Sequence, residues 1–231
     1  MRSLLLFPML AGTILGQTQP EALDMLRRSA SALQEFRTGE IDTENTGIYQ
    51  RTSKPLTIKA SLLWSMPDKV RLVIGSETAG ETSVSDGHIL ATYSKLSHEY
   101  VKREGVLPIP VAQGRAYRLP GFADNPHLTS ARIVRDEKVS VGSTIFNCAF
   151  IEAEVDGGQV ANWRRYSLWI DKETGITLRL EGVAVRDQAG KKTEFANSFV
   201  VRRLVLNQPV DESVFAFDPP SGAKSSDGSA H

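Results

Sequence analysis

The stretch that decides the fold is W-S-M-P-D-K-V-R-L-V-I (64–74), followed by S-V-S-D-G-H-I-L-A-T-Y (83–93) and S-H-E-Y-V-K-R (97–103). Apolar and charged residues alternate over 69–74, which is the pattern of a half-buried strand. Asp86-Gly87 predicts a tight turn, because Gly tolerates a positive φ and Asp binds nearby backbone amides. The stretch therefore predicts short antiparallel strands joined by tight turns.

The rest of the chain continues this pattern after one helix. Apolar residues recur every three or four positions over Pro20–Arg37, with Gly39 suited to the position after the helix end. About eleven strands follow, with turns about ten residues apart, so we expect an antiparallel meander that is closed or nearly closed. The expected strands are Thr43–Arg51, Leu56–Met66, Lys69–Ser76, Thr82–Ser85, His88–Ser94, Ser97–Arg103, Ala131–Val139, Ile145–Val155, Trp163–Asp171, Gly175–Val185 and Thr193–Leu206.

Composition indicates an ordinary globular protein. The 231 residues are 41% hydrophobic and 23% charged, which favours one domain with a sizeable core. Lys plus Arg and Asp plus Glu both number 27, so the chain has no bulk field that would attract nucleic acid or an anionic membrane. We expect a monomer without a nucleic-acid partner.

The N-terminus has the pattern of a secretory signal. Arg2 precedes an apolar run from Leu4 to Ile14, and small or polar residues follow from Gly16. We expect residues 1–16 to be a signal peptide, residues 17–222 the mature domain and residues 223–231 a disordered tail. An uncleaved anchor remains the alternative.

Few residues of the sequence indicate a catalytic or nucleic-acid-binding role. Cys148 lies alone in an apolar strand, where a thiol behaves as a small hydrophobe. The run Ser85–His88 contains triad residue types, but neighbours in one turn do not form the relay. Glu152 and Glu154 share a strand face and resemble a glycosidase pair only in spacing. Arg164 and Arg165 should point to opposite faces of their strand, so they form no nucleic-acid stripe.

No His pair has metal-ligand spacing, and no glycine loop could cradle a phosphate. We therefore expect no metal, no cofactor and no enzymatic activity. An envelope hydrolase that uses the Ser85 turn or the glutamate pair ranks last among the alternatives.

The long connection Gly105–Ser130 contains four prolines with apolar residues between them. A connection of this length in a compact domain is commonly a lid or a binding loop. Two interpretations stay open, a loop that plugs one end of the barrel as ordinary core and a movable cover over an apolar cavity.

Two strands are apolar on both faces. In 145–155 and in 195–206, apolar residues occupy odd and even positions alike. A sheet that is apolar on both faces needs cover on both. One helix cannot cover so large a sheet, so the other face should enclose a core, a ligand space or both.

The order of these motifs resembles the periplasmic outer-membrane lipoprotein carrier family (LolA-like). The resemblance rests on W-S-M-P-D-K-V-R, V-S-D-G-H-I-L-A-T-Y, I-D-K-E-T-G (170–175) and F-A-F-D-P-P-S-G (215–222), and it spans about Pro20 to Gly222. The positions that match are Pro67, Arg71, Ser85, Asp86, Gly87, Tyr93, Phe217, Pro219, Pro220 and Gly222. The carriers have a basic residue just before the proline that helps latch the lid, and this chain has Met66 there.

The resemblance implies a mainly β fold with a few helices, an incomplete antiparallel barrel around a helix-bearing lid, with an apolar cavity for acyl chains. It implies a periplasmic protein that carries lipid or acylated lipoprotein, with an inner-membrane release complex or an outer-membrane receptor as partner. The alternative is an envelope-stress regulator or interaction module on the same fold, which would sense lipids or lipoproteins by protein contact. The expected ligand-binding residues are Leu62, Trp64, Met66, Leu72, Ile74, Leu90, Phe122, Leu128, Tyr166 and Leu168.

Overall fold

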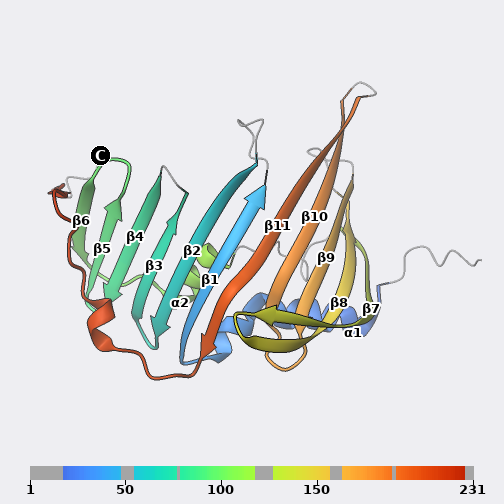
Figure 1. Cartoon of the computed structure of the whole chain (residues 1–231), viewed down its shortest axis with the longest axis horizontal. Coiled ribbons are helices and arrows are strands. Elements are labelled where there is room, and N and C mark those ends of the chain that lie inside the picture. The colour runs from blue at the N-terminus through green and yellow to red at the C-terminus, as the bar shows by residue number, and fades with distance from the viewer. Residues whose placement is uncertain are drawn as a thin grey trace, which may run out of the picture.

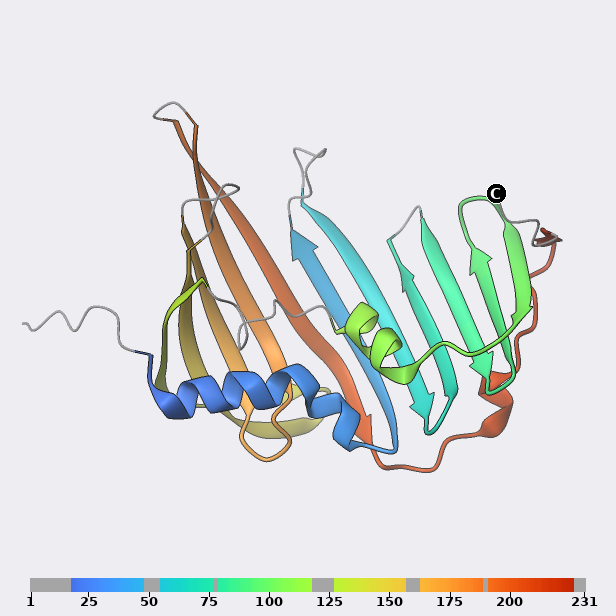
Figure 2. The same cartoon turned by 180° about the vertical axis from the view of Figure 1, so that it is seen from behind.

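The computed structural model describes residues 18–47, 55–76, 79–117, 127–156, 163–188 and 191–226. They form one open 12-stranded sheet in the order β12-β6-β5-β4-β3-β2-β1-β11-β10-β9-β8-β7, with helices on one face (Figures 1 and 2). The strands are β1 (Thr38–Gly47), β2 (Leu56–Ser65), β3 (Lys69–Gly75), β4 (Gly80–Asp86), β5 (Ile89–Ser94), β6 (Glu99–Glu104), β7 (Leu128–Val141), β8 (Thr144–Val155), β9 (Trp163–Asp171), β10 (Thr177–Gln188), β11 (Lys191–Leu206) and β12 (Lys224–Ser225). The helices are α1 (Pro20–Ser31) and α2 (Ile109–Ala116), with the short 3-10 helices η1 (Ala32–Glu35) and η2 (Glu212–Phe215).

The expected fold class, a mainly β incomplete antiparallel barrel, is confirmed. Every pair of neighbouring strands is antiparallel except β12, which pairs parallel with β6. Strand β1 lies between β2 and β11 and so joins the two halves of the sheet.

The deciding stretch builds the β2–β5 meander as its alternation predicts. Leu62 pairs with Leu72 and Trp64 with Val70, and all four side chains are buried. We call the side of the sheet on which they lie, which faces α1 and α2, the inner face. The opposite side, which carries Arg71 and Val73 on β3, is the outer face.

Both helices cover the inner face. Helix α1 crosses the half of the sheet that contains β7–β11, and α2 lies over β1–β3 (Figure 2). The stripe of α1 and η1 that faces the sheet includes Ala22, Leu26 and Leu33, all nearly inaccessible to solvent. Among the described residues, no helix is both long and apolar enough to cross a membrane.

The end of the first helix differs from the expectation. Helix α1 ends at Ser31 and η1 at Glu35, and strand β1 begins at Thr38 rather than Thr43. The reason is Trp64, which is fully buried and donates its indole N–H to the Phe36 carbonyl at 3.0 Å. Gly39 pairs with Trp64 across the sheet and leaves space for its ring, instead of ending the helix.

The chain after β11 returns over the outer face of β3–β6 (Figure 1). Phe215 of η2 is buried there, and the Phe217 ring lies 5.6 Å from that of Tyr100 on β6. The segment then adds β12 to the edge of the sheet. Lys224–Ser225, which lie in the stretch expected to be a disordered tail, pair through their backbone with β6.

Candidate functional site: the inner face beneath helix α2

Helix α2 lies within the connection that was expected to be a loop or a lid. Its buried residues are Ile109, Ala112, Gln113 and Ala116, which form one stripe at helical spacing. Pro110 sits in the first turn, where a missing N–H costs nothing. Pro108 and Pro110, two of the four prolines that suggested a loop, are thus compatible with a short helix.

Polar contacts hold α2 to the elements around it. The Gln113 side-chain amide donates to the Leu33 carbonyl at 3.0 Å, and the Thr43 hydroxyl donates to the Ala116 carbonyl at 2.8 Å. The Arg115 guanidinium forms an ion pair of 2.9 Å with Glu81 on β4. These three contacts reach η1, β1 and β4, so α2 is fixed from three sides.

Tyr117 anchors the end of α2 in the other half of the sheet. Its hydroxyl donates to the Thr177 carbonyl at 2.9 Å and accepts the Thr177 N–H. Its ring meets the Phe199 ring edge-on at 5.3 Å, and burial raises the pKa of the phenol. The phenol therefore stays neutral and acts only as a hydrogen-bonding group.

The Glu81 carboxyl is the titratable group of this contact set. Burial disfavours its charge, but hydrogen bonds from Ser83 and Arg115 outweigh that effect and hold the pKa below its usual value. The Arg115–Glu81 pair is therefore ionised at neutral pH.

The closed arrangement leaves two buried polar atoms unsatisfied. Among the described residues, the Gln113 side-chain oxygen and the Thr177 hydroxyl have no hydrogen-bond partner. Each such group costs about 1–3 kcal/mol. The packing of α2 against the sheet is therefore less stable than its hydrogen bonds and ion pair alone indicate.

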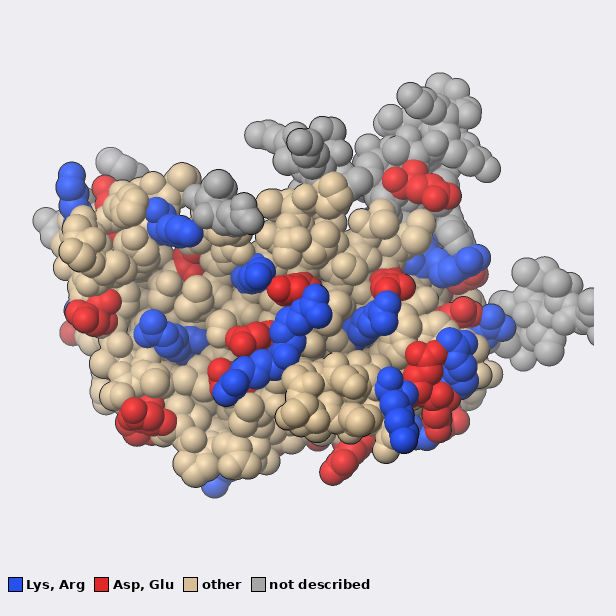
Figure 3. Space-filling view, viewed as in Figure 1, with Lys and Arg blue, Asp and Glu red and all other residues tan. Residues whose placement is uncertain are grey.

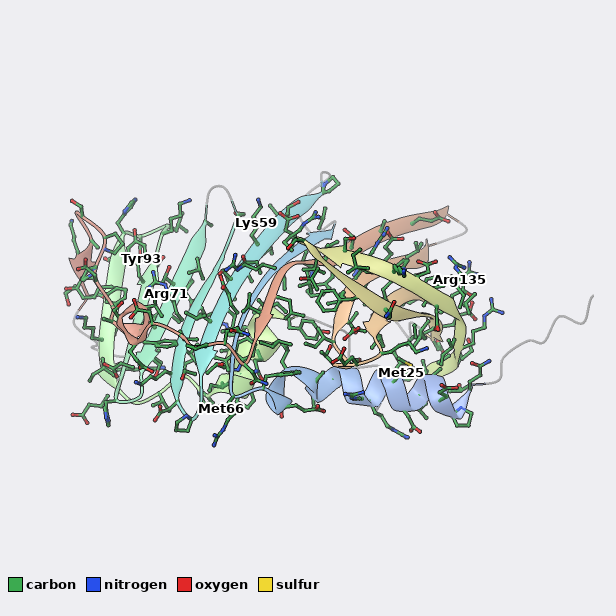
Figure 4. All side chains as sticks on the ribbon, turned by 60° about the horizontal axis from the view of Figure 1, so that its bottom comes forward. Met25, Lys59, Met66, Arg71, Tyr93 and Arg135 are labelled. Carbon is green, nitrogen blue, oxygen red and sulfur yellow. The ribbon has the colours of Figure 1, made fainter. Side chains whose placement is uncertain are left out.

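The structure brings most of the expected ligand-binding residues together. Six are buried in one core, Leu62, Trp64, Leu72, Leu90, Tyr166 and Leu168, and Ile74 and Leu128 pack against it in part. Phe122 lies outside the described residues. Met66 does not join them, because it sits beyond the end of β2 with 40% of its surface exposed (Figure 4).

Under α2 the described side chains leave a cavity of about 10 Å³, lined by residues of β1–β3 and of the helix itself. Such a space holds at most about one water. An acyl chain would therefore have to displace α2 to reach this face.

The residues at α2 were missed by the sequence reasoning, which named none of Glu81, Gln113, Arg115 and Tyr117. The helical spacing of Ile109, Ala112 and Ala116 was the available signal. Four prolines in the same connection obscured it.

The other chemical candidates have structural explanations. Asp86 accepts the N–H groups of His88 and Ile89, both at 2.8 Å, and these bonds lower its pKa. Ser85 is fully buried and donates to the Asp68 carbonyl at 3.1 Å. This part of the chain is a hydrogen-bonded turn at the β4–β5 junction.

Cys148 is buried, and burial raises the pKa of its thiol to about 12, so it stays protonated. Glu152 and Glu154 form ion pairs with Arg132 and Arg165 on the outer face. Figure 3 shows acidic and basic side chains interspersed over this face, as such pairs require.

Comparison with known proteins gives no match to any family model and none to the curated proteins. Solved structures do match, all at low identity. The lipoprotein LppX of Mycobacterium tuberculosis is 12% identical over 84% of this chain and 99% of its own, with a TM-score of 0.46. The Pseudomonas aeruginosa MucA/MucB complex matches at 13% over 86% of this chain and 61% of that one, with a TM-score of 0.40. A LolA superfamily protein of Nitrosomonas europaea, the family that the sequence motifs resemble, matches at 10% over 85% and 97%, with a TM-score of 0.34.

Proposed function

We propose that this protein is an exported carrier that holds the acyl chains of a lipid or lipoprotein against the inner face and moves them through the envelope toward the outer membrane. Its cover is helix α2, and its ligand wall is the apolar surface of β1–β3 beneath that helix. The partners of this function are a donor at the inner membrane and a receptor at the outer membrane.

The observation that carries the proposal is that α2 buries few large apolar side chains against a sheet surface that is itself apolar. The helix contributes one large side chain, Ile109, to that contact, beside Ala112 and Ala116. Leu107 just before it adds a second. Exposing these two large side chains costs about 3–6 kcal/mol.

An acyl chain offers more than this cost. Burial gains about 0.8 kcal/mol per CH₂, so a chain with a dozen buried methylenes gains roughly 10 kcal/mol before the cost of association. Displacing α2 also breaks its hydrogen bonds to Leu33, Thr43 and Thr177, each worth about 0.5–1.5 kcal/mol net. It exposes the unsatisfied Gln113 side-chain oxygen to solvent. The gain from the methylenes is comparable to these costs, so a long acyl chain can compete with α2 for this wall.

The test uses two neighbouring residues on opposite faces of β3. Ile74 lines the space under α2, and Val73 is 39% exposed on the outer face. We expect Ile74→Asn to weaken binding of myristate at least about tenfold, since a polar group would replace part of the ligand wall. Val73→Asn should bind as the parent does, and melting curves of both variants establish that they fold.

Native mass spectrometry of protein from an envelope fraction, with lipid extraction, identifies the cargo. A co-purifying lipid or acylated protein at one-to-one stoichiometry supports the carrier. A bare mass that stays unchanged after lipid is added contradicts it, and favours the interaction module as the function of this fold.

A further inference from the structure

The inner face of β9 changes character along the strand. Ile170 and Leu168 are fully buried, Tyr166 is nearly so, and Arg164 is only half-buried. Alternate residues of a strand share one face and lie roughly 7 Å apart. One row of side chains therefore runs from apolar through aromatic to cationic.

The neighbouring strands place Arg164 on the same apolar wall. It pairs with Val155 of β8, which itself pairs with Leu128 of β7. Val155 is buried and Leu128 packs against the core. A guanidinium thus stands at the margin of an otherwise apolar surface.

Arg164 lies at the end of β9 that is remote from the β9–β10 turn. That turn is bound by α1, because Arg28 donates to the Glu173 carbonyl at 2.7 Å. Arg164 and Asp171 are the second and last residues of β9, so they are separated by roughly 23 Å. The row thus has a deep end near α1 and an opposite, cationic end.

Within the described part of the chain, no counter-charge pairs with the Arg164 side chain. Its Nε is buried without a hydrogen-bond partner, and among the described residues no carboxylate forms an ion pair with it. The adjacent Arg165 differs, since on the outer face it pairs with Glu154 at 3.5 Å. A buried guanidinium N–H without an acceptor is costly, and an anion would satisfy it.

We propose that Arg164 binds the anionic head group of the ligand, a carboxylate or phosphate, while the acyl chain runs from there across the inner face toward the strands beneath α2. This inference rests on the proposed function and narrows its ligand class to anionic amphiphiles. A guanidinium suits both head groups because its paired N–H donors match two oxygens. Strands β10 and β11 separate β9 from β1, so the chain would cross roughly 14 Å of sheet, a distance that a myristoyl chain spans.

The experiment compares two probes with the same acyl chain, myristate and the uncharged 1-monomyristoylglycerol, both below their aggregation concentrations. The parent protein should bind myristate about tenfold more tightly than the neutral probe, which is the effect of one charge-assisted hydrogen-bonded pair. Arg164→Gln should abolish this preference without weakening the neutral probe, and Arg164→Lys should retain part of it. Arg165→Gln is the matched control and should leave the preference unchanged.

The outcomes separate the two proposals. If Arg164→Gln keeps the full preference, the head-group site is refuted while the carrier survives. If neither probe binds the parent protein, the carrier itself is refuted. If inorganic phosphate alone binds in an Arg164-dependent way and as tightly as myristate, the site is one for a free anion and not for a lipid. Circular dichroism of Arg164→Gln checks that a lost preference is not lost fold.

Discussion

At the residue scale, one close approach fixes the path of the chain between the first helix and the first strand. A Cβ at Gly39 would lie 2.3 Å from ring atoms of Trp64, which is too short for any contact. The indole is fully buried and tied to the Phe36 carbonyl, so it has no free direction in which to move. Gly39 is therefore required by packing and not by an unusual backbone angle.

We expect Gly39→Ala to destabilise the protein by about 1–3 kcal/mol through overpacking. The matched control is Gly114→Ala, because no atom lies within 4 Å of the Cβ position there and Ala favours the helix. It should be neutral or stabilise by roughly 0.5–1 kcal/mol. Urea denaturation measures both changes, and equal stability of the two variants would show that the Trp64 ring yields.

In a second group of residues, on the outer face, charged side chains contact aromatic rings. The Trp169 indole donates to Glu137 at 2.6 Å, and Arg135 lies 4.5 Å from the Phe150 ring centroid while also binding Glu137. The hydrogen bond from Trp169, and after it the contact with Arg135, holds the pKa of Glu137 below its usual value. The charged carboxylate is therefore favoured in the folded state.

This lowered pKa predicts a pH dependence of stability. A depressed carboxyl pKa contributes stability above the unfolded-state value of about 4.3, and that contribution is lost as the pH falls through the folded-state value. We expect Glu137→Gln to flatten the decline in melting temperature between about pH 5 and pH 3. Glu173→Gln, at the exposed β9–β10 turn, is the control, and identical pH profiles for the two variants would contradict the assignment.

At the scale of elements, α2 shows why a lid is harder to read from sequence than a strand. Strands β2–β5 follow from local alternation, and their observed bounds differ from those expected by no more than a few residues. Helix α2 has only eight residues, and alanines form half of its buried stripe. A short run of small residues between prolines gives too weak a periodic signal.

The predicted C-terminal end of the first helix was wrong for a different reason. The apolar period continues to Phe36, but the α-helix becomes a 3-10 helix after Ser31, and the backbone turns extended at Phe36, where Trp64 binds the carbonyl. That contact joins residues 28 positions apart. No local pattern contains it.

The contacts of α2 lead to a prediction about lid release. Glu81→Gln weakens the partly buried ion pair with Arg115, which is worth on the order of 1 kcal/mol, so lipid uptake should become a few-fold faster with little change in stability. The parent protein should show the same acceleration as the pH falls through the lowered pKa of Glu81. Stopped-flow fluorescence with a fatty-acid probe measures the rate.

Glu212→Gln provides the control, since it weakens an ion pair with Lys69 at the outer face. It should leave the uptake rate unchanged. Equal acceleration by both variants would indicate general loosening of the fold and not release of α2.

At the scale of the whole molecule, the order of strands was beyond the sequence pattern alone. Strand β1 pairs with β11, and residues such as Ile41 and Leu204 meet although the rest of the sheet separates them in sequence. The spacing of strands and turns predicted a meander that is closed or nearly closed, and the family resemblance predicted an incomplete barrel. Neither source revealed that no described carboxylate pairs with Arg164, because an ion pair depends on which side chains of neighbouring strands reach it.

The two inner-face helices bury different amounts of apolar surface on the open sheet, and hydrogen exchange should reveal the difference in their stability. Helix α1 has 12 residues and buries Leu26, and η1 continues it with the buried Leu33, whereas α2 has eight residues and buries Ile109 as its one large apolar side chain. We expect the amides of α2 to exchange well before those of α1 and of the central strands, since local opening follows the apolar area buried.

Addition of myristate should increase the difference in exchange rate between the two helices. If the acyl chain takes the place of α2, exchange in 109–116 accelerates while exchange in β1–β3 slows, because the ligand then covers those strands. Helix α1 should be unaffected and serves as the internal control. Protection that rises in α2 together with β1–β3 would mean that the helix closes over the ligand and is not displaced by it. Protection that is unchanged throughout, under conditions where myristate binds, would place the ligand away from the inner face.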